Sequence, residues 1–250
     1  MAMGMTKLLE RAEDRGPAQR ERVTSSERSR RVLALAWVAI LGLGSLPGWG
    51  ASDTDIHRIA DRVDAHYNRL QTLQADFSET YNGAGVNRTE SGVLWLKRPG
   101  QMRWEYRQPR EKLFLSDGKT VWFYVPGERQ VRRMPLHKLD DLHSPLAYLL
   151  GHTRLEKEFT GLSLATNLPP DRAGDLVLRG VPRRLGGVEQ VLFEIAPDGS
   201  FDRIVVAQED GSTTEFRFSN QVENHAISAA RFQFTVPPGV ETVQADQLEQ

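Results

Sequence analysis

Between Ala75 and Met134 the sequence contains short stretches of β-forming residues that begin about ten residues apart. Gly-rich, Pro-Gly and Asp-Gly turn signals separate them, and such signals are typical of tight connections between strands. This rhythm indicates an antiparallel meander. The expected strands are Ala75–Tyr81, Val86–Leu96, Gln101–Arg107, Lys112–Leu115, Thr120–Val125 and Gln130–Met134.

The same rhythm resumes in the C-terminal part of the chain, where Asp198-Gly199 and Asp210-Gly211 are typical hairpin turns. No low-complexity linker or change of composition follows residue 52, so residues 51–250 are expected to form a single domain. We expect a mainly β (α+β) fold with a large, strongly curved antiparallel sheet. Its further strands are expected at Leu162–Ala165, Asp175–Arg179, Glu189–Ile195, Phe201–Gln208, Thr213–Phe218 and Arg231–Val236.

Two segments have helical rather than strand periodicity. Between Thr54 and Leu73 the apolar residues recur at intervals of three, four and seven positions, which predicts an amphipathic helix. In residues 135–151 leucines recur at steps of three and four, and Pro145 divides the segment into two short helices. One long helix and a pair of short ones are therefore expected beside the sheet.

The N-terminal region differs from the rest of the chain. Residues 32–46 contain no charged side chain, follow Arg30-Arg31 and precede Pro47-Gly48, which is typical of a secretory signal. This segment is short for a bilayer span, and a membrane anchor or a buried helix is the alternative. We expect residues 1–50 to be an N-terminal extension and signal that is removed after Gly50.

The composition excludes several kinds of site and partner. The chain has no Cys, which excludes disulfides, thiolate metal sites and a Cys nucleophile. Its 32 Lys and Arg balance 33 Asp and Glu, whereas a nucleic-acid-binding protein usually has a basic excess. Residues 97–138 nevertheless hold 11 Lys and Arg against 4 Asp and Glu. We interpret this stretch, with Arg129, Arg132 and Arg133, either as a face that docks an acidic partner or as an ordinary solvated surface.

The sequence contains no recognisable pattern of catalytic residues. The six His lack the spacings of known metal motifs, and neither a nucleophile elbow nor a phosphate loop is present. His137 and His143 flank Asp140-Asp141, but surface histidines explain this spacing better than a metal site does. We therefore expect no enzyme activity, no metal and no cofactor.

Some of the expected strands are apolar on both faces. Residues 93–96 and 121–125 do not alternate with polar residues, as the strands of a sheet with one face in water would do. Both faces are therefore expected to avoid water. One of them encloses either an apolar cavity, as in small barrels, or an ordinary packed core.

Several motifs together resemble the LolA family, the periplasmic carriers of outer-membrane lipoproteins. The run LWLKRPGQMRWEY at residues 94–106 is followed by Gln108-Pro109 and by SDGKTVWFY at residues 116–124. The resemblance extends from Leu70–Phe77 to Arg231–Val240. It implies an incomplete, strongly curved antiparallel β half-barrel, with the long N-terminal helix and the short helices as a lid over an apolar cavity.

The resemblance also implies roles for individual residues. Arg98 matches the family arginine that ties the lid to the barrel, and a guanidinium suits hydrogen bonds to free carbonyls at helix ends. Met102 stands where the family often has Phe, so its lid contact is expected to be looser. For each apolar position an ordinary core is the alternative. The residues expected to line the acyl-chain cavity are Val63, Tyr67, Trp95, Met102, Trp104, Leu146 and Leu149.

The same resemblance implies a periplasmic, soluble carrier that acts as a monomer and is not lipid-anchored. Its expected partners are acylated lipoproteins, the inner-membrane ABC transporter that releases them and the outer-membrane receptor that accepts them. Two other classes share the fold: the receptor itself, which needs a lipid-modified Cys, and periplasmic lipid-sensing regulators, which usually carry an additional domain. The absence of Cys and the length of the chain favour the carrier.

Overall fold

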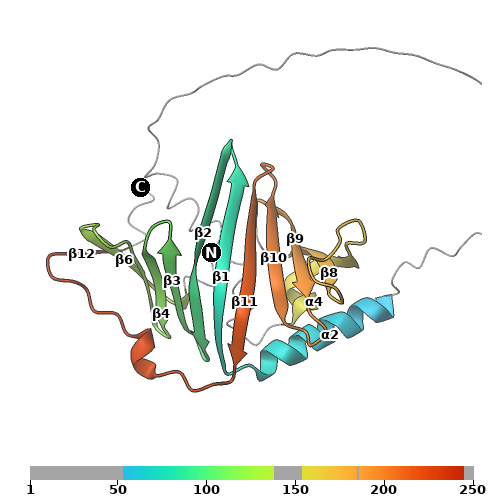
Figure 1. The fold of residues 1–250 in the computed structure, drawn as a ribbon, viewed down its shortest axis with the longest axis horizontal. Helices are drawn as coiled ribbons and strands as arrows, with labels where there is room; N and C mark the ends of the chain where they lie inside the picture. The colour runs from blue at the N-terminus through green and yellow to red at the C-terminus, as the bar shows by residue number, and fades with distance from the viewer. Residues whose placement is uncertain (1–52, 138–153, 185, 245–250) are drawn as a thin grey trace, which may run out of the picture.

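The computed structural model describes residues 53–137, 154–184 and 186–244. Twelve strands form one curved, open sheet in the order β12-β6-β5-β4-β3-β2-β1-β11-β10-β9-β8-β7 (Figure 1). This confirms the mainly β architecture. The strands are β1 (Thr72–Gly83), β2 (Val86–Lys97), β3 (Gln101–Gln108), β4 (Lys112–Asp117), β5 (Thr120–Tyr124), β6 (Gln130–Pro135), β7 (Phe159–Leu164), β8 (Leu176–Pro182), β9 (Val188–Ile195), β10 (Phe201–Gln208), β11 (Thr213–Glu223) and β12 (Glu241–Gln244).

Neighbouring strands pair antiparallel, as expected, except for β12 and β6, which run parallel. The helix α2 (Asp53–Arg69) covers most of the segment of helical periodicity, begins one residue before it and ends just before β1. The short helices expected over residues 135–151 fall mostly outside the described residues. A further helix, α4 (Leu155–Glu158), precedes β7.

Alternation of side chains gives the sheet two distinct faces. On one face, Phe77, Leu94, Trp104 and Phe216 form a single buried cluster with residues of α2, and we call this the inner face. The opposite, outer face carries most of the charged residues of the strands. Figure 1 shows α2 passing beside the lower ends of β10 and β9.

The aromatic side chains on the inner face show how strongly the sheet curves. Trp104 on β3 and Phe216 on β11 are separated by β2 and β1, so their backbones are roughly 14 Å apart along the sheet. Their ring centroids are nonetheless 6.0 Å apart. Gly92 contributes to this curvature, because the β2–β3 register shifts there and an added Cβ would lie 1.8 Å from the Glu105 carbonyl oxygen.

The prediction of a last strand at Arg231–Val236 is wrong. Ser228 begins the short helix η2 (Ala229–Phe232) by accepting a hydrogen bond from the Ala230 N–H at 3.3 Å. Phe232 is then buried with Val93 and Trp95 in a small cluster on the outer face. Apolar residues alternate in this segment because it lies across the sheet on one side, without pairing to a strand. This covering explains why β2 is apolar on both faces.

Candidate functional site

The candidate site is the aromatic inner face of the central strands. Phe77 packs edge-on against Trp104 and Tyr106, with ring centroids 4.7 and 5.0 Å away. Phe216 and Phe218 complete this group from β11. All of these rings are buried, so the centre of the inner face consists of hydrocarbon and aromatic groups. Such a surface favours apolar ligands over polar ones.

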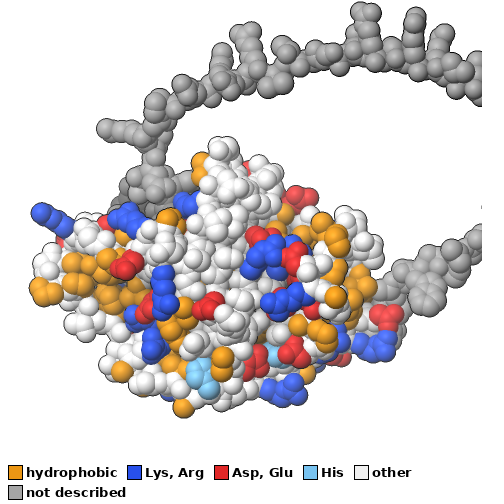
Figure 2. Space-filling model, viewed as in Figure 1, with side chains coloured by type: hydrophobic (Ala, Val, Ile, Leu, Met, Phe, Trp, Pro, Cys, Tyr) orange, Lys and Arg blue, Asp and Glu red, His pale blue; other side chains and the backbone are white. Residues whose placement is uncertain are grey.

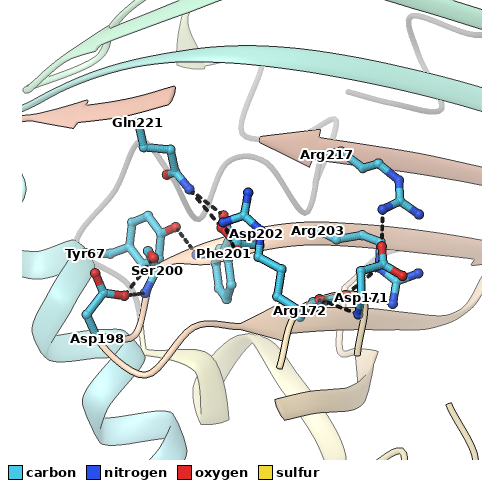
Figure 3. Close-up of polar contacts among 11 residues, drawn as sticks. Tyr67, Asp171, Arg172, Asp198, Ser200, Phe201, Asp202, Arg203, Arg217 and Gln221 are labelled. Carbon is cyan, nitrogen blue, oxygen red and sulfur yellow. Dashed lines mark hydrogen bonds and ion pairs between the residues drawn. The ribbon is translucent and has the colours of Figure 1, made fainter. Parts of the chain in front are cut away.

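Buried polar contacts hold α2 over the side of the sheet formed by β7 to β10. The Tyr67 hydroxyl accepts a hydrogen bond from the Phe201 N–H at 2.9 Å, and the two rings stack at 4.8 Å (Figure 3). The Asp64 carboxylate accepts from the Leu155 N–H, also at 2.9 Å, at the start of α4. Burial raises the pKa of the Tyr67 hydroxyl well above its usual range, so the hydroxyl stays protonated.

The turn between β9 and β10 also fits closely against this helix. Gly199 adopts a φ of 95°, and an added Cβ would lie 2.8 Å from the Arg62 carbonyl oxygen. Only glycine combines this backbone conformation with such a close approach. At the C-terminal end of α2, His66 Nε2 lies 2.8 Å from a carboxylate oxygen of Glu223 on β11. These contacts fix the C-terminal half of the helix to the strands and connections beneath it.

A buried polar cluster adjoins the aromatic group on the inner face. Glu79 on β1 lies opposite Glu90 on β2 and accepts a hydrogen bond from the Tyr106 hydroxyl at 2.6 Å. Lys112 on β4 forms an ion pair with Glu90. Burial raises the pKa of Glu79 to about 7; the bond from Tyr106 opposes this rise and the charge of Glu90 adds to it. Glu79 therefore titrates near neutral pH.

The outer face over β11 and β10 is charged with both signs (Figure 2). Arg203 binds Glu194 at 2.7 Å, and Arg217 pairs with Glu215 at 2.6 Å. Arg217 also pairs with Asp171, as Figure 3 shows. A hollow of about 340 Å³ in this region is lined mainly by such residues. Because burying charges against hydrocarbon is costly, this hollow is a poor site for an apolar ligand.

The structure brings together some of the residues that the sequence assigned to the cavity. Val63 and Tyr67 on α2 belong to the same inner cluster as Met102 and Trp104 on β3. Trp95 lies on the outer face, where its indole N–H donates to Gln74 at 2.9 Å. Leu146 and Leu149 lie outside the described residues.

Arg98 lies half-buried in the turn between β2 and β3. Its backbone N–H donates to the Gln71 carbonyl at 2.9 Å, which ties this turn to the connection between α2 and β1. The three arginines expected to dock a partner do not share one face. Arg132 lies over the inner-face ring of Phe123, 5.8 Å from its centroid, whereas Arg129 and Arg133 are exposed.

Sequence reasoning did not identify the buried polar cluster. Glu79 shares the strand parity of Phe77 and Tyr81, and Lys112 shares that of Phe114. A charged residue at such a position predicts a buried, paired charge, so the signal was present. Its partners could not be predicted, since they come from four different strands.

Neither a metal site nor a membrane-spanning helix is found in the described ranges. No three His, Asp or Glu side chains in residues 53–137, 154–184 and 186–244 lie close enough together to hold a metal ion. Within the same residues, no helix combines the length and the apolarity needed to cross a bilayer.

Comparison with known proteins assigns the chain to a family. Residues 68–235 match the family of the outer membrane lipoprotein carrier protein LolA. The outer-membrane lipoprotein carrier protein of Chromobacterium violaceum is 34% identical over 74% of this chain and 87% of its own length. The protein of the same name from Bordetella pertussis is 32% identical over 84% of this chain and 95% of its own.

Among solved structures, an uncharacterized conserved protein from Thermus thermophilus shares the fold at 15% identity, with a TM-score of 0.50, covering 75% of this chain and 98% of that one. This likeness concerns the fold alone. The match over residues 68–235 and the identities to the curated relatives extend over most of the chain. The chain therefore belongs to the LolA family of outer-membrane lipoprotein carrier proteins.

Proposed function

We propose that this protein is a periplasmic carrier that shields the acyl chains of lipoproteins in transit to the outer membrane. The observation that carries this proposal is the continuous aromatic inner face, combined with membership of the LolA family. Each buried methylene contributes about 0.8 kcal/mol, so one chain of ~16 carbons gains up to about 13 kcal/mol. A carrier without an enzymatic step needs only such a surface and a way to expose it.

The test is a reconstituted transfer reaction. An acylated lipoprotein in membranes that contain its releasing transporter is incubated with the mature protein, and the soluble fraction is analysed by mass spectrometry. We expect a soluble complex that contains the lipoprotein and this protein. Release that requires detergent even in the presence of the protein would contradict the carrier function.

Within this function, we propose that Arg98 joins a helical lid to the half-barrel. Its place in the turn that is bonded to Gln71, next to the end of α2, supports this role. Five donors on a planar group suit several carbonyls at once. Opening the lid then exchanges lid contacts for lipid contacts, which permits loading and release without ATP bound to the carrier.

An Arg98→Leu variant tests the lid. We expect it to load lipoprotein but to retain it, so that complexes accumulate in the periplasm. Arg103→Leu is the matched control, because Arg103 follows the same turn on β3 but pairs with Glu105 on the outer face at 2.6 Å. Normal release by the Arg98 variant would refute the assignment.

We also propose that exposed basic residues dock the inner-membrane transporter or the outer-membrane receptor. Arg129 and Arg133 are exposed on and near β6, where they can meet an acidic surface. Charge reversal at either is expected to slow transfer in a salt-dependent way. Reversal at Arg183, an exposed arginine after β8, is the control. Arg132→Glu is expected to alter lipid binding instead, since Arg132 contacts Phe123.

The proposed location rests on the N-terminal sequence. We propose that residues 1–50 are an export signal and extension, and that residues 51–250 are the mature, unanchored carrier domain. N-terminal sequencing of protein isolated from the periplasm tests this, with a start near Ala51 as the expected result. Recovery of a longer protein in the membrane fraction would contradict it.

A further inference from the structure

Three buried polar atoms on the inner face lack hydrogen bonds within the described part of the chain. They are the indole Nε1 of Trp104, the hydroxyl of Thr214 and the Oε2 atom of Glu90. The residues are 1%, 0% and 3% exposed. A buried polar group without a partner costs about 1–3 kcal/mol, and folded proteins contain few of them.

These atoms belong to one region of the sheet. Thr214 and Phe216 are inner-face neighbours on β11, and the ring of Phe216 is 6.0 Å from that of Trp104. Phe216 lies opposite Glu79, which in turn lies opposite Glu90. The three groups therefore belong to one region of the inner face, within and beside the aromatic surface.

Their chemistry is complementary to a polar group within a largely apolar ligand. The indole N–H can only donate, a carboxylate can only accept, and the hydroxyl can do both. The other oxygen of Glu90 is held by Lys112, and Arg88 Nε lies 3.8 Å from the unbonded one. An ester carbonyl needs a donor, and an amide offers both a donor and an acceptor.

We infer that these groups form a polar subsite that binds the ester and amide groups by which acyl chains are attached to the lipoprotein. This inference rests on the proposed carrier function. The chains lie on the aromatic surface of Phe77, Trp104 and Phe216, and the subsite fixes how far they enter. The ligand supplies hydrogen bonds that these three groups do not make within the described residues, so the subsite favours acylated molecules over plain hydrocarbons of equal length.

The test uses two probes that differ only in carbonyl groups. One is a dipalmitoyl-glyceryl-cysteinyl lipopeptide, and the other is its dihexadecyl ether analogue. Affinities for the mature protein are measured by displacement of an apolar fluorophore, and the ester-to-ether ratio is compared between variants. We expect Trp104→Phe and Thr214→Val each to lower this ratio about five-fold, the effect of one hydrogen bond, because any change in apolar packing affects both probes and cancels in the ratio.

Controls separate the possible failures. Trp95→Phe, on the outer face, should leave the ratio unchanged. Thr214→Val is nearly isosteric and decides the matter if Trp104→Phe does not fold. An unchanged ratio in Thr214→Val and in any folded Trp104 variant overturns the subsite but leaves the carrier function standing, because both lipids still bind. If neither lipid binds the unaltered protein, the proposed function itself fails.

Discussion

Two equally buried glutamates on opposite faces of the sheet have different surroundings. Glu194, on the outer face, accepts hydrogen bonds from the backbone N–H groups of Asp171 and Arg172 at 2.7 and 3.1 Å and is held by Arg203. Glu90, on the inner face, has one oxygen paired with Lys112 and the other without a hydrogen bond in the described ranges.

Two tryptophans repeat this contrast. The N–H of Trp95 on the outer face has an acceptor in Gln74, whereas that of Trp104 on the inner face has none among the described residues. At these two outer-face positions the buried polar group has its partners within the protein, whereas Arg179 Nε on the outer side of β8 has none among the described residues. On the inner face, stability has been given up at specific atoms, which is typical of surfaces built for a ligand.

The largest expected effect concerns apolar packing beneath α2. Phe193 is fully buried on the inner face and its ring lies 5.0 Å from that of Phe159 and 5.1 Å from that of Phe201. Phe193→Ala is expected to lower the free energy of unfolding by about 4 kcal/mol. Phe234→Ala, a half-buried position on the outer face, should cost less than half as much. If urea unfolding shows equal losses of unfolding free energy for the two variants, the packing of the inner and outer faces does not differ in the way proposed.

Next in size is the ionic network of the outer face. Arg203→Met leaves the buried Glu194 carboxylate without its side-chain partner and should destabilise the fold by about 2–3 kcal/mol. Adding Glu194→Gln to this variant should restore part of the loss. A double-mutant cycle by chemical unfolding measures this coupling, and strictly additive losses would show that the pair does not stabilise the protein.

Buried carboxyl groups predict an unusual pH dependence. Burial raises the pKa of Glu79 to about 7, and burial together with the charge of Asp202 raises that of Asp175 to about 6. Because the folded state binds these protons more tightly than the unfolded state, the free energy of unfolding should fall as pH rises from about 4.5 to 7.

The variant Glu79→Gln isolates one of these groups. It keeps a neutral side chain beside Tyr106, so it should remove about 2 kcal/mol of this pH dependence, as followed by thermal unfolding across the range. Asp175→Asn should act similarly at slightly lower pH. Parallel curves for Glu79→Gln and the unaltered protein would contradict the titration of Glu79 near neutral pH.

The smallest effects concern two threonines. Thr214→Val removes a buried hydroxyl without a partner in the described residues and should raise stability by about 1 kcal/mol. Thr80→Val removes a hydroxyl that lies 3.1 Å from that of Thr89 on an exposed strand pair. This change should lower the free energy of unfolding by only a few tenths of about 1 kcal/mol. A lower free energy of unfolding for Thr214→Val would mean that this hydroxyl makes a hydrogen bond in solution.

Much of the fold could be predicted because strands and turns are local features. The strand expected at Phe201–Gln208 has the same first and last residues as β10. The turns at Asp198-Gly199 and Asp210-Gly211 join it to β9 and β11, the neighbours expected from the sequence. The expected strand Arg231–Val236 failed because an apolar alternation reports contact on one side only. Lying on a sheet and pairing within it produce the same pattern.

The site was less predictable, for a geometric reason. Residues 93–96 are apolar at every position, so their pattern does not say whether Leu94 or Trp95 faces inward. The register with β3 decides it, placing Leu94 beside Trp104 on the inner face and leaving Trp95 outside. Arg132 and Arg133 separate in the same way, since adjacent residues of a strand point to opposite faces.

The sequence by itself determined the antiparallel strands, the amphipathic helix and, through the motifs at residues 94–124, the resemblance to one family. Tertiary structure alone decided which of two apolar faces is the inner one and which buried polar atoms remain without partners in the described part of the chain. Local patterns depend on neighbours along the chain. Whether the buried polar atoms of Trp104, Thr214 and Glu90 find hydrogen-bond partners depends on groups from distant strands. The curvature of the sheet determines whether those groups come close enough to bond.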